Sequence, residues 1–274
     1  MRLERVSGFP QPGQPGLAWL GQAGFWIETG THRVLIDPYL SDSLARKYEG
    51  QPNDHRRIMP VPVAAEELPR PDLVLVTHGH GDHMDPDTLG PLARRFPDLP
   101  FVVPAARLPL ARERIGAEAQ LLPVDAGDRL APIPGLALTV FPAAHETLER
   151  DAEGRHVFLG FGLAWEEARL YHSGDCVPFP GLEDLLAAFA PDAMLLPVNG
   201  RGAPRLQAGI PGNFHLEEAI GLARGAGASV LVPHHFGLFA FNTIDPEWIE
   251  RAAAACADLA VVPPRIGETM RIRR

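Results

Sequence analysis

The sequence predicts an α/β fold in which helices cover β-sheets, and three observations support this prediction. Short apolar runs of three to eleven residues, a length typical of strands, recur along the chain. Segments with helical spacing lie between them, and two begin with Asp-Pro, a frequent helix start, at Asp85-Pro86 and Asp245-Pro246. Proline and glycine are spread throughout as turn residues. Interspersed strands and helices favour sheets packed under helices.

Strands are predicted where apolar and β-branched residues are continuous. In chain order they are residues 17–27, 33–36, 73–77, 101–103, 136–141, 157–165, 169–172, 193–198, 229–232 and 259–262. Helices are predicted where apolar residues recur every three or four positions, as at Leu89, Leu92 and Phe96. The predicted helices are residues 86–96, 105–115, 182–189, 216–224 and 246–255.

Length and composition favour one domain over residues 1–274, with an irregular N-terminal segment at 1–16 where proline and glycine cluster. The 25 Lys and Arg against 34 Asp and Glu give a net charge of −9. A chain this acidic lacks the basic face that polynucleotide binding requires. The N-terminus has no signal-peptide core and no apolar run reaches the ~18 residues of a membrane span. We therefore expect a cytoplasmic protein that does not bind membranes.

The segment 73–83 carries the strongest functional signal. An apolar strand leads directly into a loop that holds His78, His80, Asp82 and His83, with glycines at 79 and 81 that let the backbone bend. Imidazole and carboxylate donors suit Zn, Fe, Ni or Mn better than Ca or Mg. Four donors exceed what one open catalytic ion needs, so two adjacent ions are expected.

Further donors follow other apolar runs, where loops on a rigid scaffold commonly carry chemistry. These candidates are His145, Asp175, His234 and His235.

The remaining histidines and the cysteines are expected to have other roles. His32 and His55 lie in polar stretches and are expected at the surface, whereas His156 and His172 occupy strand positions and are expected to be structural. For His215 a helix N-terminal role and a substrate contact both stay open. Cys176 and Cys256 form no C-x-x-C pair, which favours a reducing compartment, and Cys176 is expected to be a small buried residue beside Asp175.

The H-x-H-x-D-H spacing at 78–83, followed by His, Asp and His elements in the same order, resembles the metallo-β-lactamase superfamily over residues from about 17 to 270. Within it, segments 36–38, 195–201 and 233–236 resemble the L-ascorbate-6-phosphate lactonase-like branch. The resemblance implies an αββα four-layer sandwich, two mixed β-sheets flanked by helices, with the site at one edge.

The resemblance also implies two divalent metal ions, with Zn the default and Mn or Fe as alternatives. One ion would be held by His78, His80 and His145. The other would be held by Asp82, His83 and His235, with Asp175 bridging the two. His235 is preferred to His234 because it directly precedes the aromatic residue at 236, and His234 would then support the site or contact substrate. Asp37 would support the metal-binding loop.

These features predict a metal-dependent hydrolase in which a metal-bridging hydroxide attacks a small lactone, ester or phosphorylated ester. Asp82 is the candidate catalytic residue, because it can steer protons as well as bind metal. Asn199, Arg201 and Arg205 are candidates to clamp an anionic substrate, since a guanidinium fork suits phosphate or carboxylate. The glycine-rich segment 200–214 is a candidate mobile loop over the site. Self-association into a homo-oligomer is compatible with the sequence.

Three other functions are compatible with part of this pattern. Phosphodiester cleavage of a small nucleotide or nucleic acid uses similar donors, but the acidic charge counts against polynucleotides. A diiron oxygen- or NO-reducing domain would have Glu at the position of His80 and would need a flavin partner. A relic site in a regulatory protein is disfavoured by the complete donor set.

Overall fold

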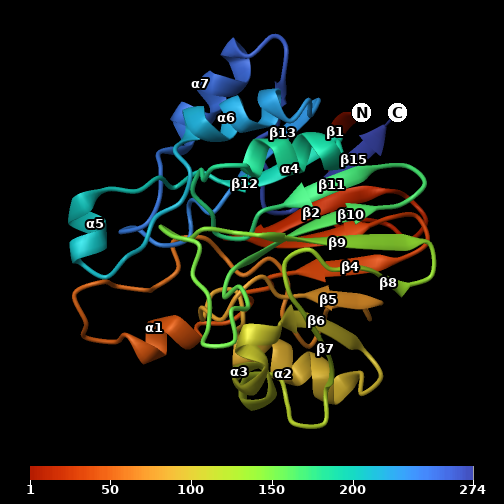
Figure 1. The fold of residues 1–274 in the computed structure, drawn as a ribbon, viewed down its shortest axis with the longest axis vertical. Helices are drawn as coiled ribbons and strands as arrows, with labels where there is room; N and C mark the ends of the chain where they lie inside the picture. Colours follow the sequence, from red (N-terminus) through yellow and green to blue (C-terminus); the bar gives the residue numbers. More distant parts are fainter. Residues whose placement is uncertain (274) are drawn as a thin grey trace.

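Two β-sheets face each other in the computed structural model, which describes residues 1–273 (Figure 1). The first sheet has the strand order β1-β15-β2-β3-β4-β5-β6-β7, and the second has β14-β13-β12-β11-β10-β9-β8. Strands β4 to β7 and strands β11 to β14 run parallel to their neighbours, and the other pairs are antiparallel. Both sheets are therefore mixed, which confirms the predicted fold class.

The first sheet consists of β1 (Arg2–Ser7), β2 (Gly16–Gly21), β3 (Gly24–Glu28), β4 (Arg33–Ile36), β5 (Leu73–Leu75), β6 (Pro100–Pro104), β7 (Gln120–Val124) and β15 (Glu268–Arg273). The second consists of β8 (Arg129–Ile133), β9 (Leu136–Pro142), β10 (Leu159–Ala164), β11 (Arg169–His172), β12 (Ala193–Pro197), β13 (Val230–His234) and β14 (Ala260–Val261). The helices are α1 (Ser43–Lys47), α2 (Pro86–Arg95), the 3₁₀ turn η1 (Ala105–Arg107), α3 (Leu108–Arg114), α4 (Leu182–Phe189), α5 (Ala203–Gln207), α6 (Leu216–Gly225) and α7 (Pro246–Ala255).

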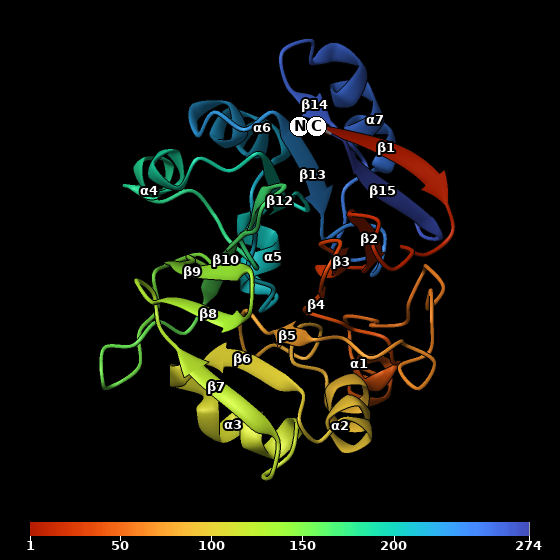
Figure 2. The ribbon, with the colours of Figure 1, turned by 90° about the vertical axis from the view of Figure 1, so that its right-hand side faces the viewer.

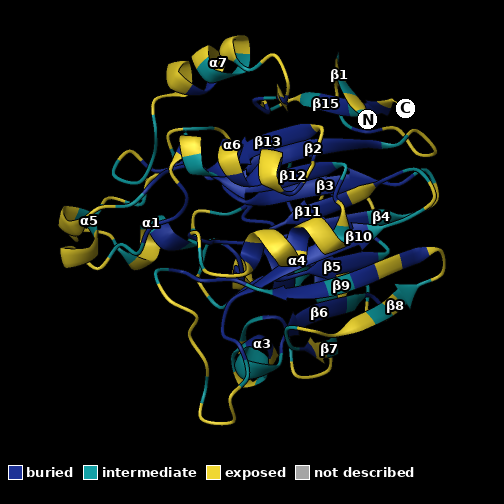
Figure 3. Ribbon diagram, turned by 45° about the horizontal axis from the view of Figure 1, so that its top comes forward, coloured by how far each residue is buried: buried dark blue, intermediate teal, exposed yellow. Residues whose placement is uncertain are grey.

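Helices cover the outer face of each sheet. Helix α3 contacts β6 and β7 and packs beside α2, whereas α6 lies on β12 and β13 and α7 on β14. Figure 2 shows the first sheet curving from β1 to β7 and the second sheet beside it. Figure 3 shows the strands of the interior buried and the outward sides of α4, α6 and α7 exposed. None of the helices within residues 1–273 is long and apolar enough to cross a bilayer.

The uninterrupted apolar character of β2 to β4 follows from burial on both faces. Leu17 and Trp19 pack in a core that also contains residues of the second sheet. Ala18 and Leu20, which alternate with them, pack in a separate core together with residues of α2 and α3. Because neighbouring side chains of a strand point to opposite faces, a strand between two cores needs apolar residues at every position.

The predicted helix starts are confirmed. The Asp85 carboxylate accepts a hydrogen bond from the Asp87 amide, and Asp245 accepts one from the Glu247 amide, so both aspartates cap helices that begin with proline. The predicted helices at 182–189 and 246–255 coincide with α4 and α7. The single apolar run predicted at 17–27 is a hairpin of β2 and β3 with its turn at Gln22.

The prediction of an irregular N-terminal segment at 1–16 is wrong for residues 2–7. These residues form β1, which pairs antiparallel with β15 at the edge of the first sheet. Four of the six residues of β1 are exposed, because it is an edge strand, and its sequence therefore lacks a continuous apolar run. The sequence also did not predict β7, β8, β15, α1 and α5.

Candidate metal centre

Five strands end at the same edge of the sandwich and are followed by loops that converge on one site. Residue Asp37 follows β4, the segment 78–83 follows β5, His145 follows β9, Asp175 follows β11 and His235 follows β13. Donors from both sheets are thus brought together by strand ends, in agreement with the expectation from the sequence.

The donor atoms form two groups. One group consists of His78, His80 and Asp175, and the other of Asp82, His83 and His235. Within each group the donor atoms lie within 4.8 Å of one another. The second group is the set predicted from the sequence for one ion.

Asp175 connects the two groups. Its Oδ1 lies 3.3 Å from His83 Nε2, and its Oδ2 lies 3.2 Å from His235 Nε2. His145 was predicted as a ligand beside His78 and His80, but the structure places it next to their group. Its Nε2 lies 3.6 Å from Asp175 Oδ2, while its Nδ1 lies 2.9 Å from the Gly212 carbonyl oxygen. That second contact orients the ring so that Nε2 faces the site.

The loop after β5 is held from behind by Asp37, as the resemblance implied. The fully buried Asp37 carboxylate accepts hydrogen bonds from the Thr77 amide at 2.8 Å and from the Thr77 hydroxyl at 2.5 Å. It also lies 2.7 Å from His83 Nδ1. This contact leaves Nε2 of His83 directed at the donor groups, an arrangement common behind metal-binding histidines.

Glycines 79 and 81 have a different role from the one predicted. Neither has a positive φ, so the bend does not require glycine. A Cβ at Gly79 would lie 2.9 Å from the Leu110 side chain, and one at Gly81 would lie 2.5 Å from that of Leu44. Because residues 79 and 81 have no side chains, α1 and α3 can pack directly on the loop 78–83.

The residues present fit divalent metal ions. Three buried atoms of the donor groups, His78 Nε2, His83 Nε2 and Asp175 Oδ1, have no hydrogen-bond partner within residues 1–273. Leaving such atoms unpaired costs about 1–3 kcal/mol each, and a bound cation would satisfy all three. Nitrogen and oxygen donors of this kind suit Zn, Mn or Fe.

The protonation states support the same conclusion. Burial lowers the pKa of His145 to about 4 and that of His78 well below its usual value, so both present a free lone pair at neutral pH. Burial opposes the charge of His83, yet the nearby carboxylates of Asp175 and Asp37 raise its pKa well above the usual value. The carboxylates therefore favour a positive charge at this point, which a metal ion would supply in place of the proton.

Backbone strain is concentrated around the site. Five non-glycine residues within the described part of the chain have positive φ, and four of them, Gln22, Asp37, Glu146 and His235, lie in or beside the donor groups. Such conformations cost of the order of 1–3 kcal/mol each and persist where surrounding contacts impose them.

Gln22 is a residue of the site that was not predicted from the sequence. Its side-chain amide nitrogen donates to Asp82 Oδ2 at 2.7 Å and lies 3.1 Å from His235 Nε2. Its backbone carbonyl accepts hydrogen bonds from the His235 amide and from the Trp19 indole, both at 2.9 Å. A lone glutamine in a β-hairpin turn carries no sequence signal for this role, because the contacts join residues 60 and 213 positions apart.

Replacing Gln22 with alanine should weaken metal binding about 10- to 100-fold, the usual effect of removing a group that orients a ligand. The fold should persist, because the backbone carbonyl contacts remain. Competition of the purified variant against a chelator of known affinity would measure the change. Gln11→Ala is a matched control, since that exposed amide donates to the nearby Phe9 carbonyl and lies outside the site. Equal metal affinity in all three proteins would contradict the role given to Gln22.

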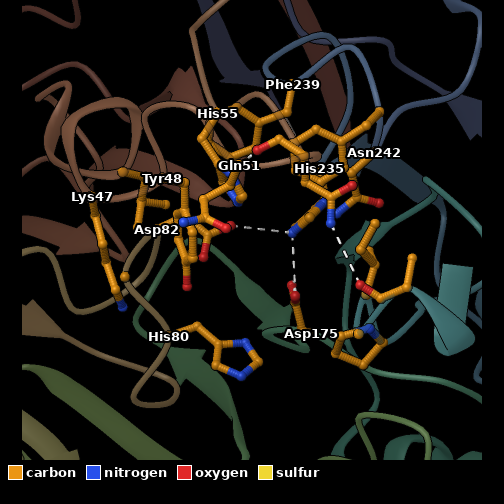
Figure 4. Close-up of a pocket in the computed structure, with 18 of the residues that line it drawn as sticks. Lys47, Tyr48, Gln51, His55, His80, Asp82, Asp175, His235, Phe239 and Asn242 are labelled. Atoms are coloured by element: carbon orange, nitrogen blue, oxygen red, sulfur yellow. Dashed lines mark hydrogen bonds and ion pairs between the residues drawn. The ribbon is translucent and has the colours of Figure 1, made fainter.

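Four donor-group residues, His80, Asp82, Asp175 and His235, form the floor of a cavity of about 580 Å³. Its walls come from residues of segments 44–55, 208–211 and 235–242. Figure 4 shows His80 and Asp175 at one end and His55 and Phe239 at the other, with Asp82 and His235 between them. The volume is in the range of sites that enclose small molecules.

The predicted substrate clamp is not formed. Arg201 donates from both terminal nitrogens to the Glu218 carboxylate, at 2.6 and 2.7 Å, and does not line the cavity. Arg205 donates to the carbonyl oxygens of residues 199, 200 and 243. Asn199 is buried and donates to the Asn242 side chain at 2.7 Å. Asn199 thus supports Asn242, which does line the cavity, and the two arginines stabilise the surrounding loops.

His234 was predicted as a supporting or substrate-contacting residue, and the structure places it away from the cavity. It is fully buried, does not line the cavity, and stacks on His172 with ring centroids 4.7 Å apart. The carbonyl of Ala23 lies 2.9 Å from His172 Nε2, so His172 is structural as predicted. His234 is the last residue of the buried strand β13, whereas His235 follows the strand with a φ of 61° and faces Asp175.

Three other histidines, His156, His215 and His55, lie outside the donor groups. His156 is buried against Asp125, with 2.9 Å between Nδ1 and Oδ1, which confirms its structural role. His215 is the N-cap residue of α6, and its amide hydrogen-bonds to the Glu218 carboxylate, which favours the helix reading. His55 was predicted to lie at the surface, but it is half-buried and lines the cavity.

Cys176 is fully buried beside Asp175, and burial raises the pKa of its thiol to about 12. Its thiol should therefore stay protonated and unreactive up to pH 9. Titration of the native protein with Ellman's reagent should label one thiol per chain, that of the half-buried Cys256, and two after unfolding. Fast labelling of a Cys256→Ser variant would show that Cys176 is accessible and reactive after all.

Known proteins resemble this chain in sequence and in fold. The profile of the β-lactamase superfamily domain matches residues 32–236. The chain is 30% identical over 258 residues to a UPF0173 metal-dependent hydrolase of Archaeoglobus fulgidus, and the match covers 92% of this chain and 97% of the relative. A second UPF0173 metal-dependent hydrolase, from Methanoregula boonei, is 29% identical over 260 residues, with 93% and 97% of the two chains covered.

The fold also resembles that of an isothiocyanate hydrolase from Delia radicum gut bacteria, with a TM-score of 0.75, 20% identity, and 94% and 98% of the two chains covered. At this identity the likeness concerns the fold. The profile match, the full-length relatives and the two His/Asp groups at the strand ends agree, and they show that this chain belongs to the metallo-β-lactamase superfamily and is a metal-dependent hydrolase.

Proposed function

We propose that the cavity binds two divalent metal ions, Zn by default, and hydrolyses a small lactone, ester or phosphorylated ester. The observation that carries this proposal is the pair of adjacent donor groups on the cavity floor, joined by Asp175. The lactone in this proposal comes from the sequence resemblance to the lactonase-like branch. Substrate would enter from the open side, where the exposed His80 lies.

Bound ions would supply a water molecule that ionises near neutral pH and would polarise the carbonyl or phosphoryl oxygen of the substrate. The chain supplies the geometry. His78 and His83 are fixed from behind through Thr77 and Asp37, so their Nε2 atoms face the cavity floor. Asp82 lines the cavity and is oriented by the Gln22 amide, and we assign proton transfer to its carboxylate.

A nucleophilic serine or cysteine is not needed in this scheme. Cys176, the cysteine nearest to the donor groups in sequence, is fully buried and does not line the cavity. Its thiol lies 3.3 Å from the Val177 carbonyl oxygen, to which it donates. The attacking group is therefore expected to be water.

Metal content of protein purified without added metal, combined with a hydrolysis screen, tests the proposal. The screen would contain lactones, carboxylic esters, sugar phosphates and phosphodiesters, each with untreated and with EDTA-treated protein. About two ions per chain and turnover of a lactone or ester that EDTA abolishes would support it. No turnover after reloading with Zn, Mn or Fe would contradict it.

A further inference from the structure

The outer wall of the cavity is aromatic. His55 stacks on Tyr48, with ring centroids 4.2 Å apart and 21° between the planes. The His55 ring also meets Phe239 and Phe241, at 5.1 and 4.7 Å, and these two phenylalanines lie parallel to each other within 8°. All four rings line the cavity, and Figure 4 shows His55 and Phe239 at the end away from His80 and Asp175. We call these four rings the aromatic wall.

The aromatic wall is partly accessible from within the cavity. Phe239 is buried, whereas Tyr48, His55 and Phe241 are half-buried. Aromatic rings prefer partners in offset-stacked or edge-to-face geometry, and each such pair contributes beyond the area it buries. A planar ring of a ligand would find both geometries here, because the wall presents stacked and edge-on rings side by side.

One cation lies next to the aromatic wall. The Lys47 ammonium is 5.0 Å from the centre of the Tyr48 ring, and Lys47 forms no ion pair with any residue from 1 to 273. The other lining cation, Arg114, donates to the carbonyl oxygens of Gly79 and Met84. Lys47 is therefore the available partner for a negative charge at this end of the cavity.

We propose that the substrate is a carboxylic ester or lactone that carries an aromatic ring and at most one negative charge. The inference rests on the proposed hydrolase function and specifies its substrate. The ring would pack on the aromatic wall, Lys47 would pair with the charge, and the ester would lie over the donor groups. Hydrolysis adds water across the acyl C–O bond and gives a carboxylic acid and an alcohol from an ester, or one hydroxy acid from a lactone.

The same features disfavour a phosphorylated substrate. A phosphate monoester carries about −1.5 to −2 charges at neutral pH and is usually bound by forked arginine contacts. Arg201 and Arg205, the arginines expected to provide them, are used by Glu218 and by loop carbonyls. A single flexible lysine matches one carboxylate better.

Three methyl esters test the inference: methyl phenylacetate, its para-carboxylate derivative and methyl hexanoate. In Phe241→Leu, which keeps an apolar side chain, the ratio of kcat/KM for methyl phenylacetate to that for methyl hexanoate should fall about fivefold. In Lys47→Gln, the preference for the carboxylate derivative over methyl phenylacetate should fall about threefold or more. Trp248→Ala removes an exposed ring on α7 and should leave both ratios unchanged.

Ketone analogues, in which CH2 replaces the ester oxygen, separate binding from hydrolysis. Calorimetric binding of the aryl ketone that depends on Phe241, with no ester hydrolysed, would contradict the proposed function but support the aromatic wall as a binding surface. Ester hydrolysis with both selectivity ratios unchanged in the two variants would support the hydrolase and overturn the substrate inference.

Discussion

Replacing Asp175 with asparagine should lower kcat/KM about 1000-fold, a loss of roughly 4 kcal/mol of transition-state stabilisation. The two Asp175 oxygens face His83 and His235 at 3.3 and 3.2 Å, so the substitution removes negative charge at the point where both donor groups meet. Asparagine keeps the shape of the side chain, which separates the loss of charge from the loss of packing. Metal content and kcat/KM, measured on the same preparation, would show the effect.

The control for this prediction is Asp184→Asn, the same change at an exposed position in the first turn of α4. It should keep wild-type metal content and turnover. If Asp175→Asn kept both ions and full turnover as well, Asp175 would not connect the two donor groups as we infer.

Replacing Asp37 with alanine should destabilise the fold by about 3–5 kcal/mol, because the change leaves buried donors without a partner. The amide and hydroxyl of Thr77 and the Nδ1 of His83 all contact this carboxylate, which is fully buried. Urea unfolding of the metal-free protein would measure the loss. Metal affinity should also fall, about 10- to 100-fold, since His83 would no longer be held in place.

Two further variants make this prediction specific. Glu118→Gln, at an exposed position, should change the free energy of unfolding by no more than about 0.5 kcal/mol. Asp37→Asn keeps the volume but replaces one acceptor oxygen with a donor, so its loss of stability should fall between those of the other two. Unfolding of Asp37→Ala at the wild-type urea concentration would show that the carboxylate does not support the loop.

The sequence by itself was sufficient to predict the metal-donor loop at 78–83 and the central strands of both sheets. The spacing at 78–83 places four donors within six residues, and the strand before it is apolar on both faces. Such features can be predicted without tertiary information, because they depend on the local spacing of residues and on the burial of whole strands. The positions of His145, Asp175 and His235 after apolar runs likewise predicted their part in the site, whereas the role of Asp37 and the place of the site at one edge came from the family resemblance.

The sheet edges could not be predicted. Strands β7 and β8, each the last strand of its sheet, contain Pro123 and Pro132, which argue against a strand in the sequence but are tolerated at an edge. Strands β1 and β15 are rich in charge and acquire their structure by pairing with each other across the whole chain, from Arg2 with Arg273 to Ser7 with Glu268.

Tertiary structure alone decided which polar residues reach the substrate. Arg201 looked like a clamp in the sequence, yet Glu218, seventeen residues away, takes both of its terminal nitrogens. His55 looked like a surface residue, yet it joins the aromatic wall with residues almost 200 positions later. A metal-donor motif is local, so the sequence predicts it directly. The aromatic wall instead depends on which distant side chains lie side by side, and only packing in three dimensions determines this.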